Sequence, residues 1–140
     1  MTSFRQRAGR PAAIRRSPWQ MAAWALLGAI ACGGASAQTV YVSSEKDHKV
    51  NVFDAGGKLQ STIAVCQRPR DMKPSADGSR IHVVCGDSNQ IGVIDRASGK
   101  MIDRIPVADS PEIMALSPDG RTAYVSIEDE SVLAAYDLAS

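Results

Sequence analysis

A repeat of about 42 residues sets the strongest limit on what this chain can fold into. Pro69 recurs as Pro111, and Asp77-Gly78 recurs as Asp119-Gly120, each 42 residues later. Other markers share the period, at spacings of 41 or 42 residues: Gly57-Lys58 and Gly99-Lys100; Val42, Val83 and Val125; Asp54, Asp95 and Asp137. A period of this length indicates a chain of similar supersecondary units that bury their apolar faces against one another.

Within one period the segments are short and typical of β-strands. The runs 112–117 and 122–126 are rich in apolar and branched residues and are separated by the turn Pro118-Asp119-Gly120. In the preceding unit, the runs 91–95 and 101–107 complete a set of four. Branched residues bounded by Gly, Pro, Asp and Ser favour strands over helices.

Four short strands per period predict an antiparallel meander that is repeated in series. A radial array of such sheets is a β-propeller. We therefore expect an all-β chain, a β-propeller of four-stranded antiparallel blades with blade units at about 39–68, 69–108 and 109–140. About two and a half blades are present, so the ring is incomplete. A two-sheet sandwich with accidental self-similarity is the alternative.

The first 37 residues have the pattern of a secretory signal peptide. Five arginines and no acidic residue precede the apolar run 21–32, and Ala35-Ser36-Ala37 provides small residues before a cut between Ala37 and Gln38. This pattern predicts export to the periplasm by the general secretory route. A twin-arginine signal at Arg15-Arg16, a lipidated Cys32 and an amphipathic N-terminal helix are the alternatives.

Removing this segment changes the charge of the chain. Without its five arginines, eleven Lys and Arg stand against fifteen Asp and Glu, a formal charge of −4. A mildly acidic domain gives no electrostatic reason to expect nucleic-acid binding. An oxidising compartment permits a disulfide between Cys66 and Cys85 if their Cα atoms lie within about 7 Å, and the sequence leaves this pairing open.

The search for catalytic and metal-binding groups gives no candidate. His82 stands where the neighbouring repeats have Tyr41 and Tyr124, which indicates a packing role. We assign His48 to a solvated loop and Glu128-Asp129-Glu130 to a solvated turn. No spacing predicts a metal site, a nucleophile or a phosphate loop, so no catalytic residue and no cofactor is assigned.

One end of the blades is the expected binding face. The connections between blades and the loops between second and third strands emerge on the same side, where loops vary while the strands stay rigid. Two successive blade junctions carry different charged residues at this face. The candidate ligand-binding residues there are Arg68, Arg70, Asp71, Asp109 and Glu112.

Several stretches resemble the YVTN-type β-propeller repeat, and most of all the propeller proteins associated with PQQ-dependent catabolism. The stretches that carry the family resemblance are 91–95, 104–107 and 115–126, and those that carry the finer one are 109–112, 128–130 and Cys85. Propellers of this family have more blades than these residues supply. The chain is therefore expected to be an N-terminal fragment of a longer protein, or one of several copies that assemble into a ring.

The resemblance implies an exported, non-catalytic binding or scaffold protein of periplasmic PQQ-dependent alcohol oxidation. Its implied partner is a quinoprotein dehydrogenase or the electron carrier of that enzyme. One alternative is a propeller enzyme, a lactonase-like hydrolase or a quinoprotein-related oxidoreductase, whose active site lies in blades missing here. A cell-surface structural repeat is a third.

Overall fold

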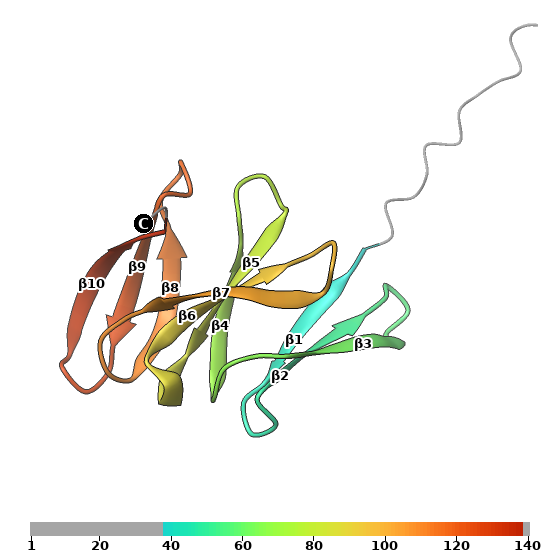
Figure 1. Ribbon diagram of the computed structural model, residues 1–140, viewed down its shortest axis with the longest axis horizontal. Coiled ribbons are helices and arrows are strands. Elements are labelled where there is room, and N and C mark those ends of the chain that lie inside the picture. The colour runs from blue at the N-terminus through green and yellow to red at the C-terminus, as the bar shows by residue number, and fades with distance from the viewer. Residues whose placement is uncertain (1–37, 139–140) are drawn as a thin grey trace, which may run out of the picture. The chain divides into compact units, whose positions relative to one another are not determined.

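The computed structural model describes residues 38–138, which form ten β-strands in three antiparallel sheets (Figure 1). A 3₁₀ turn, Gly86–Ser88, lies in the loop that connects two strands of the middle sheet. The all-β prediction is confirmed. The predicted signal peptide and the cut after Ala37 lie outside the described residues.

The middle sheet is a complete four-stranded meander. Its strands are β4 (Pro69–Pro74), β5 (Arg80–Cys85), β6 (Gln90–Asp95) and β7 (Lys100–Pro106), hydrogen-bonded in sequence order. The first sheet consists of β1 (Val40–Ser44), β2 (Lys49–Phe53) and β3 (Leu59–Ala64). The third consists of β8 (Pro111–Leu116), β9 (Thr122–Ile127) and β10 (Val132–Asp137). One complete four-stranded blade between two three-stranded sheets agrees with the predicted partial propeller.

Two apolar layers hold the three sheets together. Alternate side chains of a strand point to opposite faces, so the middle sheet contributes to both layers. Val83 lies in the layer shared with the first sheet, whereas its neighbour Val84 lies in the layer shared with the third. Both valines are fully buried. The sequence alternation along β5 therefore fixes how neighbouring blades stack.

The two ends of the blades use different turns. At one end, hairpin turns within the blades place Gly57, Gly78, Gly99 and Gly120 at positive φ, between 63° and 80°. At the other end, five residues with side chains adopt the left-handed conformation: His48, Arg68, Asn89, Ser110 and Ser131. We call this second end the loop face, made of segments 45–48, 65–68, 86–89, 107–110 and 128–131.

Candidate functional site: the loop face

The loop face repeats one hydrogen-bonding device from blade to blade. His48 Nδ1 accepts a hydrogen bond from the backbone N–H of Arg68, at 3.1 Å. One period later, Asn89 Oδ1 accepts a hydrogen bond from the backbone N–H of Ser110, also at 3.1 Å. A glycine would adopt the left-handed backbone with less strain, but it has no side chain to make this contact. His48 therefore fixes the connection between two blades.

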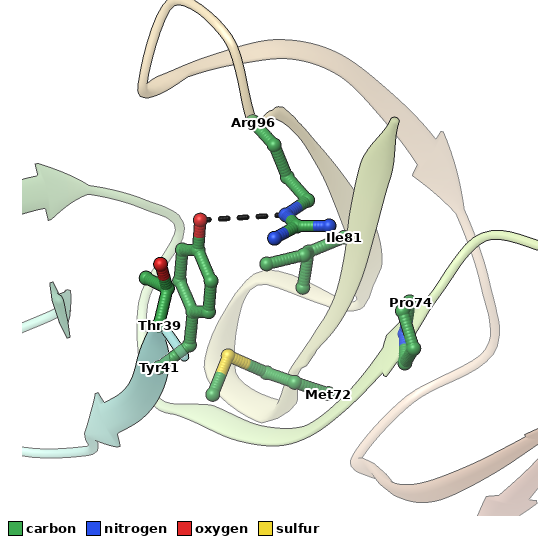
Figure 2. Close-up of a pocket in the computed structure, with 6 residues that line it drawn as sticks. All are labelled: Thr39, Tyr41, Met72, Pro74, Ile81 and Arg96. Atoms are coloured by element: carbon green, nitrogen blue, oxygen red, sulfur yellow. Dashed lines mark hydrogen bonds between the residues drawn. The ribbon is translucent and has the colours of Figure 1, made fainter. Parts of the chain in front are cut away.

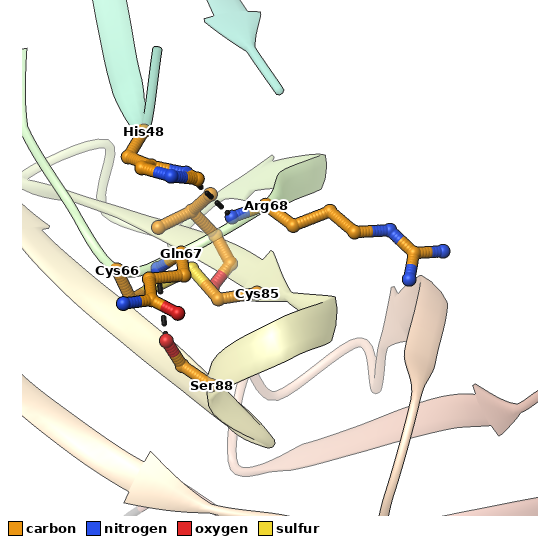
Figure 3. The surroundings of a disulfide bond; sticks show 7 residues. His48, Cys66, Gln67, Arg68, Cys85 and Ser88 are labelled. Carbon is orange, nitrogen blue, oxygen red and sulfur yellow. Dashed lines mark hydrogen bonds between the residues drawn. A yellow bond between two sulfur atoms is a disulfide. The ribbon is translucent and has the colours of Figure 1, made fainter. Parts of the chain in front are cut away.

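A disulfide strengthens the first of these connections (Figure 3). Cys66 and Cys85 are bonded, with their Cα atoms 5.8 Å apart, within the range that disulfides require. Both residues are buried. Beside them, the backbone N–H of Gln67 donates to the Ser88 hydroxyl at 2.8 Å. The segment that leads from the first sheet into β4 is thus attached to the end of β5.

Arg68 lies at the centre of a cluster of charges on the loop face. Its guanidinium is 3.2 Å from Glu45 of the first sheet's loop, 3.1 Å from Asp87 of the middle sheet's loop and 2.7 Å from Glu112 on β8. The hydrogen bond to Asp87 and the nearby carboxylates raise the pKa of Arg68. One cation therefore joins groups from all three sheets.

The residue at position 86 makes room for this arginine. A Cβ atom added to Gly86 would lie 3.3 Å from Nε of Arg68 and 3.4 Å from its Cδ and Cζ atoms. The neighbouring repeats have Glu45 and Glu128 at the corresponding position. Because position 86 is a glycine, the Arg68 guanidinium can lie close against the loop of the middle repeat.

Arg70 extends the cluster toward the inner strands. It is 2.9 Å from Glu45 and also pairs with Glu112. The Glu112 side chain is only 14% exposed. Burial raises the pKa of the Glu112 carboxyl, Arg70 opposes this rise, and the adjacent Glu128 adds to it. Glu112 is thus a partly desolvated carboxyl between two arginines.

Asp71 connects the inner strands of two sheets. Its Oδ2 atom accepts a hydrogen bond from the backbone N–H of Met114 on β8, at 3.0 Å. Its Oδ1 atom accepts from Lys73 Nζ at 2.8 Å. A polar hollow of about 520 Å³ lies here, with Arg70, Asp71 and Glu112 among its lining residues. The inner side of the loop face is therefore concave as well as charged.

Four of the five predicted site residues come together. Arg68, Arg70 and Glu112 share ion pairs, and Asp71 lies beside them in the hollow. Asp109 instead pairs with the Asn89 amide at 2.5 Å and supports the next blade connection. The cluster members missing from the predicted site are Glu45, Asp87, Glu128 and Lys73. The equivalence of positions 45 and 128 in the repeat was a signal for two of them.

Within residues 38–138, no group of three or more His, Cys, Asp or Glu side chains is placed to hold a metal ion.

His82 lies on β5, away from the loop face, and is 6% exposed. Its Nδ1 atom has no hydrogen-bond partner in the described part of the chain. Burial lowers the pKa of His82, and Arg80 lowers it further. The described segment also contains no helix of the length and apolarity needed to cross a membrane.

The meander order and the stacking of the three sheets together define part of a β-propeller. Residues 29–136 match the family described as phytase-like, with esterase-like activity of phytase, and the chain belongs to this family. No curated protein matches the chain.

Solved structures with similar folds include proteins of different functions. The chain is 29% identical to Kuenenia stuttgartiensis hydrazine synthase, with a TM-score of 0.66 over 72% of this chain and 30% of that one. Dihydro-heme d1 dehydrogenase NirN in complex with DHE matches at 20% identity and a TM-score of 0.60, over 71% of this chain and 22% of that one.

A putative 6-phosphogluconolactonase from Bacteroides fragilis also matches. The identity is 20% and the TM-score 0.58, over 69% of this chain and 31% of that one. The present chain thus spans less than a third of the length of each of these three proteins. The two matches at 20% identity show a similar fold and nothing about function.

Proposed function

We propose that this chain is an exported, non-catalytic binding or scaffold propeller that acts beside PQQ-dependent alcohol oxidation in the periplasm. Its partner is a quinoprotein dehydrogenase or the electron carrier of that enzyme. The secretory pattern of residues 1–37 and the resemblance of the repeats to the PQQ-associated propellers support this proposal. The geometry of the loop face supports it independently.

The observation that carries the proposal is the Arg68 cluster. Arg68 contacts carboxylates from three sheets, and Arg70 contacts two of the same carboxylates. These charges bind one another and connect four segments of the loop face with strands β4 and β8. A preformed surface loses little conformational freedom when a partner binds, which favours docking of another macromolecule.

The charge of the loop face indicates the chemistry of that partner. The cluster has more carboxylates than arginines, and the exposed Asp129 and Glu130 beside it take part in none of the ion pairs found between residues 38 and 138. An acidic surface attracts a partner with a basic patch and speeds its diffusional encounter. A basic electron carrier protein fits this requirement.

Binding kinetics test the proposal. The full chain is immobilised, and purified quinoprotein alcohol dehydrogenase and the electron carrier protein of that enzyme are passed over it at low and high ionic strength. We expect saturable binding of one of them, with an association rate that Asp129→Asn lowers about twofold at low salt and leaves unchanged near 0.5 M salt. Asp103→Asn, the same change on exposed β7, should have no effect. Absence of saturable binding to both proteins would contradict the proposal.

A hydrolase is the second candidate, because the family to which the chain belongs is described by esterase-like activity. In this case the charged hollow at Arg70 and Glu112 would receive an ester or phosphoester substrate. The full chain is assayed with p-nitrophenyl acetate and with phytate. Turnover that Glu112→Gln abolishes would establish the hydrolase and reject the non-catalytic role.

A further inference from the structure

A second hollow lies at the opposite end of the blades, between the first and middle sheets (Figure 2). It has a volume of about 340 Å³ and is lined by Thr39, Tyr41, Met72, Pro74, Ile81 and Arg96. Pockets for small molecules begin at about 300 Å³. The hollow, which we call the Arg96 crevice, therefore has the size of a site for a small molecule.

The walls of the Arg96 crevice are mostly apolar. The ring of Tyr41 and the side chains of Met72 and Ile81 face the space from two neighbouring sheets, as Figure 2 shows. Ile81 is only 5% exposed and gives a fixed wall. Met72 is unbranched and polarizable, so it adapts to ligands of different shape. An apolar ligand body would replace water on these surfaces.

Arg96 supplies a positive charge to this lining. Its Nη1 atom donates to the Gly78 carbonyl at 2.6 Å, its Nε atom donates to the Tyr41 hydroxyl at 3.4 Å, and its guanidinium lies 5.6 Å from the Tyr41 ring centroid. Among residues 38–138, no carboxylate forms an ion pair with Arg96. The side chain is thus oriented by neutral groups, and its charge is available to an anion.

The equivalent crevice between the middle and third sheets differs at the same repeat positions. His82 replaces Tyr41, and Leu138 replaces Arg96. The second pair of sheets therefore packs without a cation at this position. Its crevice has Arg80 instead, where the first crevice has Thr39. The placement of the cation between Tyr41 and the turn at Gly78 is thus a feature of the first crevice.

We propose that the Arg96 crevice binds a small monocarboxylate with an apolar body. The carboxylate accepts hydrogen bonds from Arg96 Nη2, and the apolar part packs against Tyr41, Met72 and Ile81. A single cation in the lining matches one negative charge, whereas a phosphate dianion would require a second. The site is separate from the loop face, so the inference does not depend on the function proposed for that face.

Hexanoate is the probe, and hexanol is its uncharged counterpart. Binding to the full chain is followed by amide NMR shifts and by calorimetry, in wild type and in Arg96→Met. We expect hexanoate to bind one site with shifts centred on Tyr41, Met72 and Ile81. Arg96→Met should weaken binding about tenfold or more, because a charge-assisted hydrogen bond is lost. Hexanol should bind the wild type as weakly as hexanoate binds the variant.

Arg104→Met is the matched control, since Arg104 is an exposed arginine on β7 of the same sheet. It makes the same change of charge and should leave hexanoate binding within about twofold. Arg96→Lys keeps the charge without the planar fork and should bind with intermediate affinity. Equal weakening by both Met variants, or equal binding of hexanoate and hexanol to the wild type, would overturn the proposal.

Discussion

His82 departs from its repeat in both residue type and burial. Tyr41 and Tyr124, its equivalents, are less buried than His82. On the paired strands it lies opposite Lys73 and Val93, and Arg80 is on its own strand. A protonated imidazole would be desolvated near the Arg80 cation, and a hydrogen bond with the Lys73 backbone offsets this only in part. The environment favours the neutral ring, which is why the pKa of His82 is lowered.

This lowered pKa predicts a loss of stability in acid. The unfolded chain takes up a proton near the ordinary histidine pKa of about 6.5, whereas the folded chain does so only at lower pH. The stabilising contribution is complete above that ordinary value and decreases as the pH falls toward the folded pKa. In that window the folded-to-unfolded ratio should fall by up to about tenfold per pH unit.

His82→Leu has a similar volume and should remove this dependence. Urea unfolding of both proteins between pH 8 and 5 measures it, and the difference between the two curves isolates His82 from the other titrating groups. Parallel curves through the whole range would show that His82 titrates alike in the folded and unfolded states.

At the scale of the elements, the disulfide explains an exception in β6. Gly92 stands where the neighbouring repeats have Asn51 and Ala134. A Cβ atom on Gly92 would lie 2.9 Å from Met101 Sδ, 3.1 Å from Cys66 Sγ and 3.1 Å from Val83 Cγ1. The disulfide sulfur occupies part of the space in which a side chain would stand, so the two features depend on each other.

Gly92→Ala should therefore destabilise the native protein by about 1–3 kcal/mol through overpacking. The same substitution in a Cys66→Ala/Cys85→Ala background should cost less, because the sulfur is absent. Removal of the disulfide itself should cost about 3 kcal/mol, given the 19-residue separation. Denaturant unfolding of the four proteins of this cycle gives the coupling. A coupling of zero would mean that Met101 and Val83 alone exclude the side chain.

The elements were predictable from the sequence, whereas the contacts between blades were only partly so. Strand positions follow from branched residues between turn signals, which are local properties, and the run 122–126 falls within β9. The Arg68 cluster depends on side chains brought together from three sheets, so only its charged positions could be predicted. Asp109 was also predicted from its charge and its position on the loop face. It lies outside the Arg68 cluster and accepts a hydrogen bond from the Asn89 amide.

Across residues 38–138, side chains on the outer faces of the first and third sheets are more exposed than their repeat equivalents between the sheets. Leu133 on β10 is 71% exposed, whereas its equivalent Ile91 on β6 is fully buried against the third sheet. Val40 and Val42 are exposed on β1, while their equivalents Ile81 and Val83 are buried. The same repeat position is thus core in one blade and surface in another.

This difference predicts opposite outcomes for matched substitutions one period apart. Ile91→Ala should cost about 2–5 kcal/mol of unfolding free energy, because it leaves a cavity between two sheets. Leu133→Ala should change it by less than about 0.5 kcal/mol, because the side chain is exposed. Chemical unfolding at two protein concentrations measures both. A large, concentration-dependent cost at Leu133 would show that the third sheet is covered by another copy in solution, since only an intermolecular contact makes stability depend on concentration.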